Sequence, residues 1–407
     1  MAAEDSGGQA GTLQTTVSAL AMFQEGADAP HYCEGAARLL LGGGFFRPES
    51  RPSRDCLVLL ARTLADQKPL RLLDLMAGCG IRSLRCGLEA EAALIWANDA
   101  DPDRRPLLDH NLLQLPQGVE QRCSTLTAQQ LLAGCLQRQE RFDLVDLDAF
   151  GCASALLPLV LEAVAFGGVL MLASSDGRSP TGHDRSAAVR RLGAAARAHP
   201  ASWELALRLQ LGTVARCAWA LGRGIEPLLS FSEGRTFRTA IRLLRRPRAD
   251  EERNLGMLAH CHGCGDQQVQ SLLALRRWQP CGCSSTVLPP LAVSGPLWIG
   301  CLQHPVTINA MLEQAGQSPP SLASEGERLL RRLATDPAAT ARCWPTEEIA
   351  RALGLGQPPL AALVAELRRQ GFSASASAVM AGQLRSDAPW SRILETAQAL
   401  LAAKAAK

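Results

Sequence analysis

The sequence predicts an α/β fold: a doubly wound domain with helices on both faces of a sheet, then a smaller α+β C-terminal domain. Three observations support this prediction. Up to Leu244, short apolar segments alternate with segments of helical periodicity. The segment 71–75 ends in the glycine-rich turn Asp74-Leu75-Met76-Ala77-Gly78-Cys79-Gly80. The run Arg245-Arg246-Pro247-Arg248 then separates this part from a cysteine-rich region. Strands that alternate with helices are typical of a mostly parallel sheet.

Hydrophobic periodicity sets the individual elements. Helical patterns cover 56–65, 81–89, 102–113 and 156–165, and strand patterns cover 71–75, 92–97, 142–147, 169–173 and 228–231. From about residue 320 the remainder is predicted to be helical. There, 346–353 and 358–370, followed by Gly371, are typical of a helix–turn–helix that leads into a wing.

Composition limits the class of protein. A chain of 407 residues with 47% hydrophobic residues can bury two or three cores, which excludes a disordered protein. The longest apolar run, 154–174, is broken by Glu162 and by Gly167-Gly168, so we predict no membrane span. The N-terminus lacks the pattern of a secretion signal. We therefore expect a cytoplasmic protein with reduced thiols, and we favour a monomer.

The basic residues are almost all arginine, because lysine occurs only at 68, 404 and 407. Arginine suits bidentate contacts with phosphate and stacking on bases, which favours a nucleic-acid partner. A GC-rich genome explains the same bias equally well. The net charge of +3 is too small to decide between them.

The glycine-rich turn predicts a cofactor site. Gly78 and Gly80 follow a strand that ends at Asp74 and precede a helix, so the backbone can approach a ligand closely. Asp99 ends the next strand, where a carboxylate can accept hydrogen bonds from both hydroxyls of a ribose. The alternatives are a nicotinamide site or no site at all.

A second signal is Asp146-Leu147-Asp148-Ala149-Phe150-Gly151 at the end of a later strand. The lone pair of an exocyclic amine is delocalised into its base and is a poor nucleophile. A carboxylate and a backbone carbonyl that accept its two N–H bonds would direct this lone pair toward a methyl donor. Asp148 and Ala149 can supply those acceptors, and Phe150 can stack on the base. The alternative is that Asp148 caps a helix and Phe150 lies in the core.

Four cysteines predict a metal site. Cys261 and Cys264 form one close pair, and Cys281 and Cys283 form a second after a longer loop. This pattern suits a structural tetrahedral Zn²⁺. His260 and His262 are alternative candidates for the fourth ligand, and unpaired surface thiols are the alternative to a metal site.

A further pattern lies on one helix face. Glu204, Arg208 and Arg216 are spaced so that they face the same side. A salt-bridge row is favoured here, and the alternative is a network that faces RNA or braces the sheet.

Taken in order, these motifs resemble the tRNA (guanine-26-N2)-dimethyltransferase family over nearly the whole chain. The matching segments are Phe45-Phe46-Arg47-Pro48, Ser53-Arg54-Asp55, Gly80-Ile81-Arg82, Asn98-Asp99, Asp146 to Gly151, Ala215-Arg216, Gly222 to Ser230, Gly295-Pro296-Leu297-Trp298 and Ser386-Asp387-Ala388-Pro389. Departures include Arg47 and Ser53, where the family has Asn, and Ala149, where it has Pro.

The resemblance implies a Rossmann-like, S-adenosylmethionine-dependent methyltransferase domain over residues 1–248. Arg54, Arg82 and Asp99 would bind the cofactor, Thr127 and Ala128 would lie near its adenine, and Asp148 and Phe150 would engage the guanine. Residues 249–407 would form a tRNA-binding domain with its zinc site at about 260–283 and a winged-helix-like end at about 320–407.

The expected activity is transfer of one or two methyl groups to N2 of a tRNA guanine, at position 26 or a neighbour. Two rival functions stay open: a methyltransferase that acts on an amine of another RNA, DNA or protein, and a catalytically degenerate RNA-binding protein.

Overall fold

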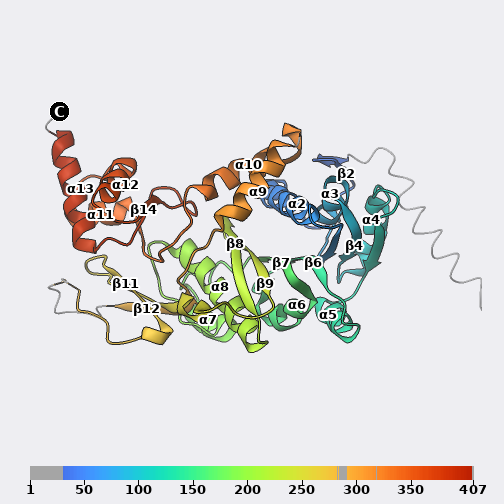
Figure 1. Ribbon diagram of the computed structural model, residues 1–407, viewed down its shortest axis with the longest axis horizontal. Coiled ribbons are helices and arrows are strands. Elements are labelled where there is room, and N and C mark those ends of the chain that lie inside the picture. Colours follow the sequence, from blue (N-terminus) through green and yellow to red (C-terminus); the bar gives the residue numbers. More distant parts are fainter. Residues whose placement is uncertain (1–30, 282, 284–290, 318, 406–407) are drawn as a thin grey trace, which may run out of the picture.

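The computed structural model describes residues 31–281, 283, 291–317 and 319–405. In Figure 1 these residues form an elongated body. The C-terminal helices α11 (Thr346–Leu353), α12 (Leu360–Arg369) and α13 (Trp390–Ala405) lie at one end, and the N-terminal strands and helices lie at the other.

A seven-stranded sheet of order β5-β4-β3-β6-β7-β9-β8 occupies the N-terminal half. Its first five strands in that order pair in parallel, whereas β9 pairs antiparallel with both β7 and β8. The strands are β3 Leu70–Asp74, β4 Ala92–Asn98, β5 Glu120–Ser124, β6 Phe142–Ala149, β7 Val164–Ser174, β8 Gly224–Glu233 and β9 Thr236–Leu244. The five predicted strands are confirmed. Two strands of this sheet were not predicted: β5, a polar edge strand, and β9.

Helices cover both faces of this sheet, which confirms the doubly wound α/β class. Successive residues of β3 show the two faces, because Leu72 packs in the core with α2 and Leu73 packs in the core with α8. The helices on the α2 face are α2 Arg51–Ala65, α3 Ile81–Glu89, α4 Arg105–Leu112, α9 Pro305–Gly316 and α10 Pro320–Ala334. Those on the other face are α5 Ala128–Gln137, α6 Leu157–Ala163 and α8 Ser202–Ala220.

Among the helices that cover this sheet, the predicted bounds hold for α3 and shift for α2, α4 and α6. The helix expected at 56–65 begins at Arg51, one turn earlier. The segment predicted as one helix over 102–113 starts as a 3-10 turn, Pro102–Arg104, before α4. The helix expected at 156–165 ends at Ala163, because β7 begins at Val164.

Two small sheets follow in the chain. Strands β10 Leu255–His260, β11 Gln267–Ser271 and β12 Ala292–Trp298 form one, which packs against α8 and α7 Arg185–Leu192. Strands β13 Cys343–Pro345, β14 Ala374–Ala376 and β15 Gln383–Ser386 form the other, packed with α11 Thr346–Leu353, α12 Leu360–Arg369 and α13 Trp390–Ala405. Strands β1 Tyr32–Glu34 and β2 Ala37–Leu39 pair in a separate hairpin. The helices predicted at 346–353 and 358–370 are present, but the expectation of a helical remainder from about residue 320 holds only in part, because β13 to β15 interrupt the helices.

A buried ion network joins α8 to the C-terminal part of the chain. Glu204 accepts hydrogen bonds from Arg208 Nε at 2.8 Å and from Arg385 Nη2 of β15 at 2.6 Å. Arg385 Nε also lies 3.0 Å from both carboxylate oxygens of Asp336. Burial would raise the pKa of Glu204, but Arg385 and Arg208 outweigh it and lower this pKa to about 2.

This network excludes the interpretation in which the charged helix face contacts RNA. Glu204 and Arg208 are 2% and 0% exposed, so they brace the fold and cannot face RNA. Arg208 also donates to four backbone carbonyls, at residues 298, 300, 338 and 340. Arg216 lies outside this network and donates to the carbonyl of Leu192.

Within the part of the chain that the structure describes, none of the helices is at once long and apolar enough to cross a lipid bilayer.

Candidate functional site

A cavity of about 600 Å³ opens at the carboxyl ends of β3, β4 and β6. Its lining comes from the turn after β3, from the ends of β4 and β6, and from the segment 45–54 before and within α2. Ligands of open α/β sheets bind at this edge. Sites for small molecules typically measure roughly 300–1,000 Å³, so the cavity has room for a nucleoside-sized ligand.

The backbone of the glycine-rich turn explains its two glycines. Gly78 and Gly80 have φ values of +57° and +82°, in the left-handed region. At Gly80, which precedes α3, a Cβ would also lie 3.0 Å from Leu108. The N–H of Gly78 donates to Asp99 Oδ2 at 2.9 Å. The structure therefore places the predicted acidic residue directly against the predicted turn, and Gly78 and Asp99 both line the cavity.

Asp74 and Asp146 lie behind the cavity as neighbours on the paired strands β3 and β6. Each is 1% exposed, and Asp74 accepts a hydrogen bond from Ser83 Oγ at 2.8 Å. Burial raises the pKa of Asp74 to about 7, and the charge of Asp146 adds to this shift. Burial also raises the pKa of Asp146, to about 6, against the opposing charge of Arg82. Asp74 and Gly80 support the turn and are not part of the cavity lining.

Arg54 lines the cavity, but its guanidinium is largely engaged by the protein. It pairs with Glu34 through Nε at 2.7 Å and Nη2 at 2.5 Å, and it donates to the carbonyls of Arg47 and Pro48. It also lies over the ring of Phe46, 5.0 Å from the centroid. In this structure Arg54 fixes the segment 45–48 along the cavity wall.

Asp148, the last but one residue of β6, is held by two arginines. Its Oδ2 accepts hydrogen bonds from Arg82 Nη2 at 3.0 Å and from Arg238 Nη1 at 3.2 Å. Burial would raise the pKa of Asp148, but the two guanidinium groups outweigh it and hold this pKa below its usual range. The carboxylate is therefore ionised at neutral pH, and among the described residues only Oδ2 has hydrogen-bond donors.

The arginines that hold Asp148 are fixed in turn. Arg82 Nη2 also donates to Ser53 Oγ at 3.1 Å, and its Nε lies 3.5 Å from Asp146. Arg238, in β9, donates through Nε to Glu233 at 2.8 Å. Both side chains are less than 10% exposed, so the geometry around Asp148 is rigid.

Phe150 lies at the cavity mouth and not in the core. It is 76% exposed, which rules out the alternative of a core aromatic. Its ring meets that of Phe45, also 70% exposed, edge to face at a centroid distance of 5.4 Å. Two exposed aromatic rings beside an ionised carboxylate can stack on a nucleobase whose amine faces that carboxylate.

Thr127 and Ala128 begin α5, where Thr127 forms a capping box with Gln130. Neither residue is part of the cavity lining. Their neighbour Leu126 is tied to the end of β4, because Asn98 Nδ2 donates to its carbonyl at 2.9 Å. A role of Thr127 and Ala128 near an adenine stays a prediction.

Sequence reasoning missed two residues of this site. Phe45 belongs to a segment that carried the family resemblance, but it was not proposed as a site residue. Arg238 lies in β9, which was not predicted, and nothing in its local sequence distinguishes an arginine that faces the cavity from one that faces solvent. The antiparallel pairing of β7 with β9 brings it beside Asp148.

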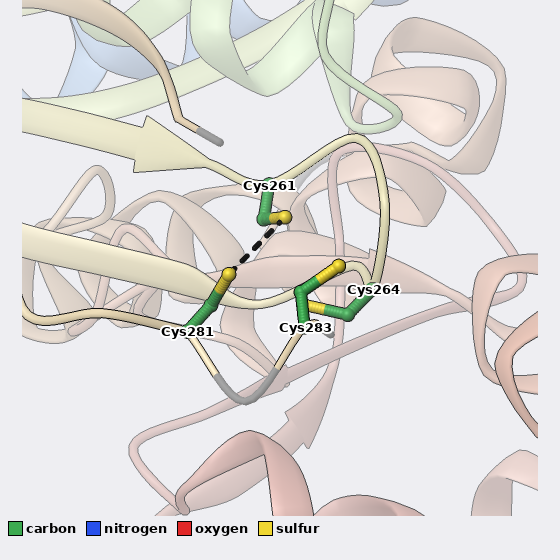
Figure 2. Close-up of side chains that lie close together, drawn as sticks. All are labelled: Cys261, Cys264, Cys281 and Cys283. Atoms are coloured by element: carbon green, nitrogen blue, oxygen red, sulfur yellow. Dashed lines mark hydrogen bonds between the residues drawn. The ribbon is translucent and has the colours of Figure 1, made fainter. Parts of the chain in front are cut away.

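The four predicted thiols meet in space, as Figure 2 shows. Cys261 and Cys264 come from the turn after β10, and the sulfur atoms of all four cysteines lie within 4.8 Å of one another. The Sγ atoms of Cys261 and Cys281 are 3.5 Å apart, and all four cysteines are free thiols. His260 and His262 contact each other edge to face and do not belong to this four-sulfur group.

Two tryptophans attach this cysteine turn to the C-terminal elements. Trp390 Nε1 donates to the carbonyl of Cys264, and Trp344 Nε1 donates to the carbonyl of Gly265, each at 2.8 Å. The two indole rings stack with centroids 5.4 Å apart. The position of the cysteine turn is therefore coupled to that of β13 and α13.

Comparison with solved structures supports the fold. Trm1 from Pyrococcus horikoshii, solved with S-adenosyl-L-methionine, superposes with a TM-score of 0.78 at 23% sequence identity. The match covers 90% of this chain and 99% of that chain. At this identity the likeness shows a shared fold.

Comparison with known sequences agrees with the resemblance noted above. The tRNA (guanine(26)-N(2))-dimethyltransferase of Methanosphaerula palustris is 29% identical over 350 residues, 85% of this chain and 89% of the relative. The enzyme of the same description from Thermococcus kodakarensis is 27% identical over 381 residues, 89% of this chain and 97% of the relative. A model of the family described as N2,N2-dimethylguanosine tRNA methyltransferase matches residues 42–398. Since this match spans nearly the whole sequence, the chain belongs to the N2,N2-dimethylguanosine tRNA methyltransferase family.

Proposed function

We propose that this chain transfers one or two methyl groups from S-adenosylmethionine to N2 of a guanine in tRNA, at position 26. The observation that carries the proposal is the arrangement of one cavity. An ionised Asp148, whose Oδ1 has no hydrogen-bond donor among the described residues, lines the same cavity as an exposed aromatic pair and the Gly78–Asp99 contact. Family membership, and relatives named for guanine-26 in tRNA, support this choice of base and position.

The cofactor half of the cavity suits S-adenosylmethionine. Asp99 can accept hydrogen bonds from a ribose, and the turn at Gly78 leaves space where a side chain would stand, because no heavy atom lies within 4 Å of the position of a Cβ there. Arg54, Arg82, Asp74 and Gly80 would hold the walls of this half, and Thr127 and Ala128 would lie near the adenine. When bound, S-adenosylmethionine supplies an activated methyl group for in-line displacement by the amine.

The other half of the cavity would position the guanine. Phe45 and Phe150 would stack on the base after it leaves the tRNA helix. Asp148 Oδ1 and the carbonyl of Ala149 would accept the two N–H bonds of the N2 amine. Arg82 and Arg238 keep Asp148 ionised and fix its direction, so the acceptor is in place before the substrate arrives.

The lowered pKa of Asp148 sets its role in the reaction. A carboxylate whose pKa is below the usual range is a weak base, so Asp148 orients the amine and stabilises the positive charge that develops on nitrogen. The amine proton becomes acidic only after methyl transfer and can then pass to Asp148 or to water. For a second transfer, the remaining N–H would be accepted in the same way.

We also propose that Cys261, Cys264, Cys281 and Cys283 hold a structural Zn²⁺. With Zn–S bonds of about 2.3 Å, tetrahedral geometry separates the sulfur atoms by roughly 3.8 Å, and these thiols lie within 4.8 Å of one another. Four protein ligands leave no open position, so this ion would stabilise the turn and take no part in methyl transfer.

We propose that the chain has two domains with different roles. Residues 1–248 would form the methyltransferase domain and residues 249–407 the tRNA-binding domain, with the zinc site at about 260–283. The winged-helix-like end at about 320–407 rests on α11 and α12 followed by β14 and β15. A cytoplasmic, monomeric enzyme is the form we expect.

Methyl transfer to defined substrates tests the proposed function. Purified protein would be incubated with labelled S-adenosylmethionine and an unmodified tRNA transcript that carries guanine at position 26. A matched transcript carries adenine there. Mass spectrometry should detect N2-methylguanosine or N2,N2-dimethylguanosine only in the first.

Ribosomal RNA, DNA and protein pools separate the rival amine acceptors in the same assay. Methylation confined to one of those pools would overturn the tRNA assignment. A chain that binds tRNA but shows no measurable affinity for S-adenosylmethionine would support the degenerate RNA-binding alternative.

A further inference from the structure

We propose that three exposed arginines at the mouth of the cavity grip RNA phosphates beside the guanine. This arginine rim consists of Arg47, Arg178 and Arg235. The inference deepens the proposed function, because it assigns the groups that hold the substrate backbone while the base enters the cavity.

The three residues come from different segments, each of which contributes a residue to the lining of the same cavity. Arg47 itself lines the cavity. Arg235 lies in the β8–β9 turn, immediately before the cavity residue Thr236. Arg178 lies in the loop after β7, three residues after the cavity residue Ser175.

A close contact joins two members of the rim. A Cβ at Gly177 would lie 2.9 Å from Cβ and 3.1 Å from Cδ of Arg235. The aliphatic stem of Arg235 therefore lies across the glycine that precedes Arg178. This packing restrains the stem of Arg235 and places the segments that carry Arg178 and Arg235 next to each other.

The charges of the rim differ from those inside the cavity. Arg82 and Arg238 are nearly buried, and each is paired with carboxylates. Arg47, Arg178 and Arg235 are exposed, and within the described residues their guanidinium groups have no ion pair and no hydrogen bond. The nearby Asp176 does not neutralise them, because it accepts a hydrogen bond from Arg191 at 2.9 Å.

The neighbouring aromatic rings favour RNA over an acidic protein as the partner. Phe45 is two residues from Arg47, and its ring meets Phe150 at the same mouth. Guanidinium groups that track a phosphate backbone, next to rings that stack on bases, are the combination with which proteins bind unpaired nucleotides. An acidic peptide would match the charges but would leave the aromatic pair without a role.

Counterion release gives the size of the effect. Each phosphate contact contributes about 0.7–0.9 to the magnitude of the slope of log affinity against log salt concentration. At 0.15 M salt, relative to a 1 M reference, each contact therefore raises the affinity about fivefold. The variant with Arg47, Arg178 and Arg235 all changed to Gln should therefore bind about a hundredfold more weakly. Its salt slope should fall by about 2 to 3.

The test measures binding of an unmodified tRNA transcript by fluorescence anisotropy at several salt concentrations. Arg246→Gln is the matched control, since Arg246 is exposed and lacks a partner in the described residues but follows the opposite end of β9 from Thr236. Each single rim variant should lose about fivefold, and the control less than about twofold. Circular dichroism should show that all variants are folded. Affinity for S-adenosylmethionine, measured by calorimetry, should be unchanged in the Arg178 and Arg235 variants, because neither residue is part of the cavity lining.

The outcomes separate this inference from the proposed function. If the triple variant keeps the affinity and salt slope of the wild type, the rim does not contact RNA. If rim changes weaken salt-dependent tRNA binding but the wild-type chain methylates no tRNA, the rim stands and the proposed activity fails. If the wild-type chain shows no salt-dependent binding of tRNA, both are overturned.

Discussion

Replacing Asp148 by Asn tests whether the carboxylate of Asp148 accepts a hydrogen bond from the substrate amine. The change preserves the size of the side chain and removes its charge. In Asp148 one oxygen accepts from both Arg82 and Arg238, which leaves the other free to accept from the substrate amine. If the Asn oxygen keeps the two arginines, its NH2 group faces the amine, and two donors then oppose each other.

The magnitude follows from the lost contact. A hydrogen bond to a charged group contributes about 1.5–3 kcal/mol. Loss of that amount in the transition state alone lowers kcat between roughly tenfold and 150-fold. The affinity for S-adenosylmethionine should change little, because the contacts at Gly78 and Asp99 are untouched.

The assay is single-turnover methyl transfer to the tRNA transcript, with cofactor affinity measured by calorimetry. Asp109→Asn is the matched control: the side chain of this aspartate is half exposed, pairs with Arg105 at 2.7 Å and lies outside the cavity. A rate for Asp148→Asn within about twofold of the wild type would remove the carboxylate from the mechanism. A comparable loss in the control would show that the assay reports general damage.

Three further outcomes follow from the structure. Arg385→Met leaves Glu204 buried without one of its two cationic partners, so the free energy of unfolding in urea should fall by about 3–5 kcal/mol; a loss below about 1 kcal/mol would contradict the ion network. Burial raises the pKa of Asp74 above its unfolded value of 3.8, so the free energy of unfolding should decrease as pH rises from about 4 to about 7. The Asp74→Asn variant should show a smaller decrease. If the variant shows the same dependence of stability on pH as the wild type, Asp74 is not its source. Cys264→Ser should abolish stoichiometric zinc in elemental analysis and change the fluorescence of the tryptophans that contact the turn after β10. The control Cys301→Ser, at an exposed cysteine elsewhere, should do neither. A wild-type protein that contains no metal would contradict the zinc proposal.

The elements around the cofactor turn could be predicted because their signals are local. An apolar strand, two glycines and a carboxylate at the next strand end follow from the geometry of a βαβ unit, and the structure places Gly78 against Asp99. The cysteine group was predictable for the same reason, since two close cysteine pairs separated by a longer loop are a local pattern that brings four thiols together. Local chemistry of this kind needs no knowledge of how distant segments pack.

The partners of Asp148 could not be predicted, because they depend on distant packing. Arg238 reaches Asp148 through an antiparallel pairing across 90 residues of sequence, and Arg385 reaches Glu204 across 181. The strand β5 was not predicted because its residues Glu120–Ser124 are polar and lie at the sheet edge, where no apolar pattern is required. The exposure of Phe150 was equally undetermined, because a phenylalanine after a strand fits a core as well as a cavity mouth.

The buried contact between Glu204 and Arg385 has a consequence for target choice. It ties the long helix α8, which packs against the seven-stranded sheet, to the C-terminal strand β15 with no solvent between the charges. This contact keeps the distance between the C-terminal elements and the cavity constant. An RNA held by the C-terminal elements would therefore present to the cavity the nucleotide that lies at that distance, so the target would be selected by its distance from the bound region as well as by the identity of its base.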